Sequence, residues 1–309
     1  MSPLFGDVMV RVHNEMKFGV VIPQPISDRT RNGALMLLPD ETTIYRKGNL
    51  EYQRQGAFVM ITDYGKGEVT LLDGEHKQFA KIAMKDYVAK IAATLPPLPD
   101  DAKDANGKAK ITITPLRKTG KTDELNGVQV EEAEVTALLD LPIPALPPDT
   151  PPPSSPLFKA TLLIWMAKSG ETVRVPAVQQ LTAQTWSTPK FSHWIDPANV
   201  FTWVFGAMPG LQGSLNGMLE AVEKTKPVIL KWHMEVGMPG MVAALKKSIA
   251  EGSQVPKGFD PEQPFSVVDS FTQEISTEKI PDAKFKVPED YKAAPFDEVA
   301  KAIGPLPKS

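Results

Sequence analysis

Residues 44–82, IYRKGNLEYQRQGAFVMITDYGKGEVTLLDGEHKQFAKI, decide the fold, because four short candidate strands and tight turns follow one another in under forty residues. Within residues 57–63, Val59 and Ile61 alternate with Phe58, Met60 and Thr62. Side chains that alternate in this way point to opposite faces of a strand, so this segment is predicted to be a strand. Residues 64–67 and the pair Asp73-Gly74 supply the glycines that tight reversals need. The stretch therefore predicts an antiparallel meander to which the rest of the chain adds strands.

The remaining chain contains both of the periodic patterns that indicate regular structure. Alternation predicts further strands at 8–12, 110–114, 128–139, 158–167, 228–236 and 265–277. Helical spacing predicts helices at 84–95, 176–186, 241–249 and 296–303, and Asp196 before Pro197 predicts the start of another. Strands outnumber helices, and the fold class that follows is α+β with an antiparallel sheet.

Proline interrupts this pattern at residues 140–157, where the sequence includes LPIPALPPDTPPPSSP. Proline has no backbone donor, so this segment cannot join a sheet ladder and should form an extended inserted loop. Two interpretations stay open. The loop is either a solvated spacer or an arm that docks a protein partner.

Composition excludes several classes of function. The 309 residues are 42% hydrophobic, which is enough for a sizeable core, and they contain no cysteine, which excludes disulfides and thiolate metal sites. The net charge of −3, without a basic cluster, gives no electrostatic footprint for nucleic acid or an anionic membrane surface. No run of ~18 apolar residues is present, so a spanning helix is not expected.

The sequence contains no complete catalytic motif. PLRKTGKT at 115–122 ends like a phosphate loop but has Pro115 where the first glycine belongs, and a strand rather than a helix follows, which favours a charged hairpin turn. The four histidines, His13, His76, His193 and His233, show no zinc-binding spacing. We expect no enzyme, no cofactor and no metal, although an active site assembled only by the fold stays open.

An apolar excess between residues 186 and 241 is the strongest functional signal. Four of the five tryptophans lie there together with many methionines, and both residue types suit a packed core as well as an adaptable apolar pocket. The sequence leaves these alternatives open. As ligand-binding candidates we single out Phe201, Trp203, Phe205, Met208, Trp232 and Met234.

Several loose patterns resemble one known family. They are an "iYrKG..E..R" strand, the LLDGEHKQFAKI hairpin, the LNGVQVEEAEV strand, and ISTEKIPDAKFKVPEDYK near the end. Together they resemble the LolA-like superfamily of lipoprotein carriers, closest to its uncharacterised periplasmic domains. The resemblance implies one domain over residues 1–309, with a curved antiparallel sheet, or incomplete barrel, whose concave face is covered by helices.

The same resemblance implies a function and a compartment. LolA-like proteins hold acyl chains in an apolar cavity between sheet and helices, so we expect non-enzymatic binding of a lipid or other apolar molecule in the bacterial cell envelope. The chain opens without a basic-then-apolar leader, so a periplasmic or secreted location requires that a signal peptide precede the given residues. The inserted loop at 140–157 and the larger helical region after Pro176 depart from the carriers. The alternative is a structural or interaction module with a packed core and a proline-rich docking arm.

Overall fold

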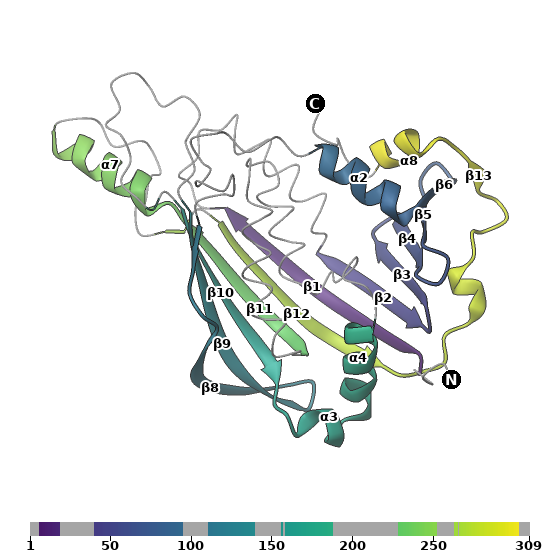
Figure 1. The fold of residues 1–309 in the computed structure, drawn as a ribbon, viewed down its shortest axis with the longest axis horizontal. Coiled ribbons are helices and arrows are strands. Elements are labelled where there is room, and N and C mark those ends of the chain that lie inside the picture. Colours follow the sequence, from purple (N-terminus) through teal and green to yellow (C-terminus); the bar gives the residue numbers. More distant parts are fainter. Residues whose placement is uncertain are drawn as a thin grey trace.

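A computed structural model describes residues 6–18, 40–94, 111–139, 156, 158–187, 228–251, 263–264 and 266–302 (Figure 1). Its strands form one open sheet. In sheet order they are β13 (Lys292–Ala293), β6 (Gln78–Ala83), β5 (Glu68–Asp73), β4 (Phe58–Asp63), β3 (Leu50–Gln55), β2 (Glu41–Lys47), β1 (Val8–Phe18), β12 (Ser266–Ser276), β11 (Ile229–Gly237), β10 (Phe158–Ala167), β9 (Val128–Leu139) and β7 (Ile111–Ile113). A further strand, β8 (Arg117–Leu125), also pairs with β9.

The pairing is antiparallel except between β13 and β6, where two residues pair in parallel. The helices described are α2 (Met84–Thr94), α3 (Glu171–Arg174), α4 (Pro176–Ser187), α7 (Pro239–Ala250) and α8 (Phe296–Ala302). The prediction of a mainly antiparallel sheet with fewer helices than strands is confirmed. Because the sheet is open and uncurled, its closure into an incomplete barrel stays a prediction.

The meander at 44–82 is confirmed, with one correction. The four expected strands correspond to β3, β4, β5 and β6, but the "iYrKG..E..R" pattern, which we expected to be one strand, is a hairpin of two strands, β2 and β3. Gly48 lies between them with a φ of 55°, in the left-handed region that glycine adopts without steric cost. The predicted single strand therefore contains a turn.

Register shows which side chains share a face. Residues directly opposite one another in an antiparallel pair point to the same side. One such row runs across five strands and consists of Val10, Ile44, Gln53, Met60 and Leu71. We call the side of the sheet that bears this row the helix-covered face.

Two groups of helices pack on the helix-covered face, at separate places over the sheet (Figure 1). Under α8, Val299 and Ala300 join a cluster with Met60, Val69, Leu71 and Ala80. Under α4, Val178 and Leu181 join a cluster with Val8, Val10, Val12, Val128, Val130, Val228 and Leu230. Strands β2 and β3 lie between the strands that carry these two clusters.

The opposite face is closed over β3–β5 by the chain that follows β12. Phe285, Val287 and Tyr291 pack on Tyr52, Val59, Ile61 and Leu72. The ammonium of Lys284 lies 4.5 Å from the ring centroid of Tyr45 and 4.7 Å from that of Tyr52. These cation–π contacts fix a segment that includes η3 (Asp282–Phe285) on the sheet.

Most predicted elements are confirmed. The helices α2, α4, α7 and α8 and the strands β9, β10, β11 and β12 lie at the predicted places, and β1 continues six residues beyond the predicted end at residue 12. The predicted helix after Asp196 lies outside the described residues, as does the proline-rich loop except for Pro156. The charged turn predicted at 115–122 is wrong, because Arg117 to Thr122 belong to strand β8.

Candidate functional site

A group of polar side chains separates the two helix-covered clusters. Opposite pairs place these residues on the helix-covered face, on the three adjacent strands β2, β3 and β4. We call this group the polar strip, and it consists of Thr42, Arg46, Glu51, Gln53, Gln55 and Thr62. All are buried except Gln55, which is half-buried. Burial of five neighbouring polar side chains is unusual, since such groups are mostly exposed in proteins.

One ion pair holds the end of the polar strip nearest to the turn after β2. The Nε of Arg46 donates to Oε2 of Glu51 over 2.7 Å, and both side chains are almost fully buried. The hydroxyl of Tyr64 lies 3.5 Å from the same carboxylate oxygen. The charges of Arg46 and Glu51 therefore offset one another within the strip.

Other polar atoms of the strip lack a hydrogen-bond partner. Gln53 is 2% exposed, yet neither its amide nitrogen nor its amide oxygen has a partner among the residues that the structure describes. The same holds for Oε1 of Glu51, Nε2 of Gln55 and Oγ1 of Thr62. An unmade hydrogen bond at a buried group costs about 1–3 kcal/mol, so the strip lowers the stability of the fold.

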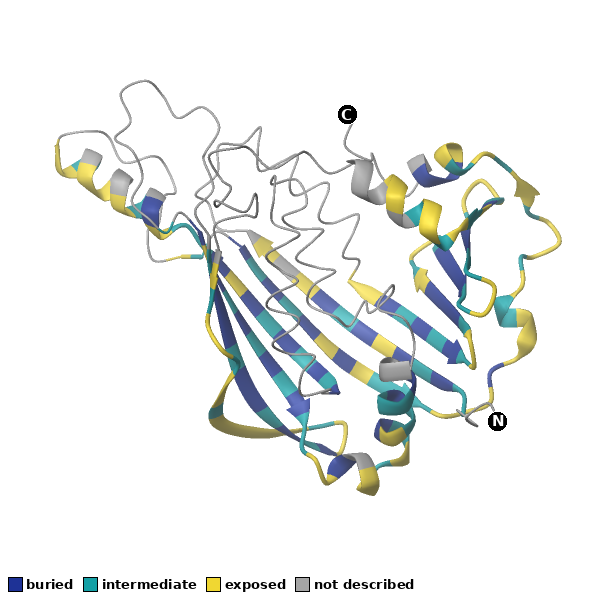
Figure 2. Ribbon diagram, in the orientation of Figure 1, coloured by how far each residue is buried: buried dark blue, intermediate teal, exposed yellow. Residues whose placement is uncertain are grey.

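Further rows connect the polar strip with the predicted site on β11. Thr42 lies opposite Val12, which lies opposite Thr272, and the next row runs from Asn14 through Ser270 to Trp232. The alternation of buried and exposed residues along these strands is visible in Figure 2. Polar side chains on β2, β1 and β12 therefore lie between the polar strip and Trp232, although Val12 of the cluster under α4 interrupts the first row.

Trp232 and Met234 are buried on the helix-covered face, as predicted from the alternation along 228–236. They lie opposite Ile164 and Leu162 on β10, and Met234 lies opposite Val268 on β12. The indole nitrogen of Trp232 is a further buried donor without a partner in the described part of the chain. This region combines large buried apolar side chains with one buried donor next to Ser270.

The other four predicted ligand-binding residues, Phe201, Trp203, Phe205 and Met208, lie outside the described residues. The structure therefore brings together Trp232 and Met234 only. It adds the polar strip, which sequence reasoning missed. The sequence contains one sign of the strip, which is that Glu51, Gln53 and Gln55 occupy alternate positions of a strand. Only the register of β3 with β4 shows that these positions are on a buried face.

A row of titratable groups lies on the face opposite to the helices. Nδ1 of His233 lies 2.8 Å from Asp269 Oδ1, and its Nε2 lies 3.1 Å from Glu235 Oε1. Burial lowers the pKa of His233, but the hydrogen bonds with Asp269 and Glu235 outweigh it and leave the pKa above its ordinary value. Two carboxylates therefore hold the imidazole of His233.

His76 also has a carboxylate partner rather than only solvent. Its Nδ1 lies 2.6 Å from Asp73 Oδ2, and this hydrogen bond raises the pKa of His76. Asp73 also accepts hydrogen bonds from the backbone nitrogens of Glu75 and His76. Burial would raise the pKa of Asp73, but these hydrogen bonds lower it below its ordinary range. The arrangement fixes the turn between β5 and β6.

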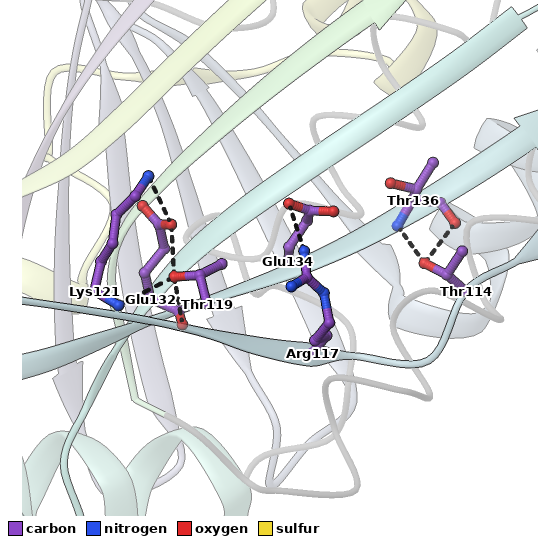
Figure 3. A network of polar contacts seen from close by, with 7 residues as sticks. All are labelled: Thr114, Arg117, Thr119, Lys121, Glu132, Glu134 and Thr136. Atoms are coloured by element: carbon purple, nitrogen blue, oxygen red, sulfur yellow. Dashed lines mark hydrogen bonds and ion pairs between the residues drawn. The ribbon is translucent and has the colours of Figure 1, made fainter.

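The described residues form neither a metal site nor a phosphate loop. Within them, no three His, Asp or Glu side chains gather so that they could hold a metal ion. The segment that resembled a phosphate loop is an edge strand whose basic side chains pair with the acidic residues of β9 (Figure 3). It precedes no helix, and the phosphate-loop geometry is therefore absent there.

None of the helices in the described part of the chain is both long and apolar enough to cross a membrane. Neither a protein-family model nor a curated protein sequence matches this chain. The LolA-like resemblance therefore stays a prediction, and the functional argument depends on the polar strip and on the apolar surface around Trp232 and Met234.

Proposed function

We propose that this protein binds a lipid or another elongated apolar molecule, without catalysis, against the helix-covered face. The observation that carries this proposal is the group of buried apolar side chains around Trp232 and Met234. It belongs to neither of the two clusters described under α4 and α8, although it lies on the same face.

The composition of this surface fits an acyl chain. Along β10, β11 and β12 the residues on this face include Ala160, Leu162, Ile164, Trp232, Met234, Val236 and Val268, all buried. Binding pockets for small molecules are mostly apolar with a few polar groups that set orientation. Burial of apolar surface contributes ~25 cal/mol per Å², less the cost of immobilising the ligand.

The resemblance to LolA-like carriers supports the finer part of the proposal. In this view the sheet and its helices act as an incomplete barrel, Phe201, Trp203, Phe205 and Met208 belong to the same site, and the protein works in the periplasm. The proline-rich loop at 140–157 then serves either as a spacer or as a contact for a protein partner.

Displacement of an apolar fluorophore by long-chain lipids tests the proposal, with Met234→Ala compared against Leu71→Ala. Leu71 is fully buried in the cluster under α8, so its truncation should cost about 2–5 kcal/mol and leave the affinity of the folded protein unchanged. Met234→Ala should cost less stability and weaken fluorophore binding.

Two results would contradict the proposal. One is the absence of saturable fluorophore binding by the parent protein. The other is an equal loss of stability in both variants, with equal affinity in the folded fraction. Either result favours the alternative, an interaction module whose core is packed and whose proline-rich segment docks a partner.

A further inference from the structure

The polar strip has more hydrogen-bonding capacity than the protein uses. Gln53 and Glu51 are at least 98% buried, at 2% and 1% exposure, and Thr62 is fully buried. Within the described residues, both amide atoms of Gln53, one oxygen of Glu51 and the hydroxyl of Thr62 have no partner. These groups offer donors and acceptors side by side, on one face and on neighbouring strands.

Packing alone does not require these side chains. The row of Gln53 continues in Ile44 on one side and in Met60 on the other, so an apolar residue at position 53 would extend an apolar row. A methionine there would fill a similar volume without unmet hydrogen bonds. Buried polar atoms without partners in a native protein call for an explanation, and ligand recognition is one that fits the position.

Charge narrows the class of ligand. The one positive charge of the strip, Arg46, is paired with Glu51, and the free oxygen of that carboxylate would repel an anion. Asp73 lies beyond Phe58 in the same row as Gln55, where it pairs with His76. The strip has no excess positive or negative charge, so it suits a group that is polar but uncharged.

The distance between Gln53 and Trp232 narrows the class of ligand further. Four strand spacings separate Gln53 on β3 from Trp232 on β11, roughly 19 Å at the usual distance between neighbouring strands. A molecule that contacts both must be long, with a polar group at one end and an apolar chain at the other. Between the two lie Thr42, Thr272 and Ser270, which are polar, and Val12, which is apolar.

We infer that the polar strip recognises an uncharged head group rich in hydroxyl or amide groups, attached to the apolar chain that lies along β10–β12. This inference rests on the proposed function, because it assigns the other end of the same ligand. Gln53 sets specificity by accepting one hydrogen bond from the head group and donating another, while Thr62 and Glu51 complete the set.

The experiment uses four ligands that share a C18 chain, each titrated against the same apolar fluorophore bound to the protein. They are monooleoylglycerol, which is neutral, oleate, which is anionic, oleylamine, which is cationic, and 1-octadecene, which has no head group. One net hydrogen bond is worth about 1 kcal/mol, so two should give monooleoylglycerol roughly a ten-fold or greater preference over 1-octadecene.

The variant Gln53→Met removes both amide atoms at nearly constant volume. It should remove most of that preference, so that monooleoylglycerol binds roughly ten-fold more weakly, while the affinity for 1-octadecene stays the same. Thr62→Val should reduce the preference by a smaller factor. The matched control is Gln273→Met, because Gln273 is a glutamine of β12 that is exposed, and its replacement should change none of the affinities.

The outcomes separate the two proposals. If none of the four ligands displaces the fluorophore, the proposed function fails and the inference fails with it. If all four displace it equally, or if Gln53→Met and Gln273→Met behave alike, apolar binding stands and the head-group inference is wrong. Tightest binding of oleate or oleylamine would also overturn it, since it would show recognition of a charge.

Discussion

The polar strip and the β8–β9 edge contain similar side chains but differ in how the protein satisfies them. On the edge, exposed basic residues of β8 form ion pairs with acidic residues of β9, two of which are drawn in Figure 3. The contacts are Arg117 with Glu134 at 3.5 Å, Lys118 with Glu131 at 2.6 Å and Lys121 with Glu132 at 3.2 Å. In the strip, by contrast, Gln53 is buried and has no partner among the described residues.

The difference separates polar residues that serve the fold from those that serve a ligand. Exposed ion pairs contribute little stability, but charges on an edge strand hinder pairing with another chain. Buried groups without partners lower stability, so their presence is better explained by a function than by the fold. The following predictions test this separation, in order of decreasing effect.

The largest effect is expected for Arg46→Met. This change leaves Glu51 as a buried carboxylate without its cation, which should cost about 3–5 kcal/mol in the free energy of unfolding. Urea titration followed by tryptophan fluorescence measures it. The double variant Arg46→Met with Glu51→Met should recover most of the loss, because a buried ion pair is often no more stabilising than apolar residues of similar volume. A small loss in the single variant would contradict burial of the pair.

A smaller effect is expected for the pH dependence that His233 contributes. Its pKa is raised in the folded state, so its stabilising contribution is complete below its ordinary pKa of about 6.5 and is lost as pH rises through the raised value. Unfolding midpoints measured between about pH 5 and about pH 9 should therefore fall more steeply in the parent than in His233→Gln. Parallel curves would show that Asp269 and Glu235 do not hold the imidazolium.

The smallest change in stability is expected on the β8 edge. Arg117→Val combined with Lys118→Val removes two ion pairs whose partners are at least partly exposed, and the free energy of unfolding should change by less than about 1 kcal/mol. Removal of the charges should nevertheless promote self-association through the exposed edge. Analytical ultracentrifugation measures this, and a variant that stays in the parent's association state would contradict the protective role of these two basic residues.

Local sequence patterns predicted the fold well where two signals agreed. Residues 57–83 combine alternation with turn glycines, and both point to the meander that β4, β5 and β6 form. The hairpin at Gly48 was missed because the residues on both sides of this glycine have the pattern of a strand. This pattern therefore predicted one continuous strand, whereas the chain reverses at Gly48. The strand at 117–125 was missed because its charged residues resemble a turn, whereas they belong to an edge strand bulged between Lys118 and Thr122.

The candidate site was predictable only in part. Alternation along β11 identified Trp232 and Met234 as inward, and burial confirms this. The polar strip was not predictable, because a period of two shows that Glu51, Gln53 and Gln55 share a side but not which side is buried. That depends on the pairing of β3 with β2 and β4 and on helices more than a hundred residues away.

The most direct test of the account is the stability of parent and Gln53→Met, with and without monooleoylglycerol. Without lipid, the variant should be more stable by about 1 kcal/mol or more, because it removes two buried atoms with unmet hydrogen bonds. With lipid, the parent should gain more stability than the variant, because a ligand stabilises in proportion to its affinity for the folded state. A variant that is less stable without lipid, and that gains as much as the parent when lipid is added, would contradict the claim that the polar strip exists to bind a ligand.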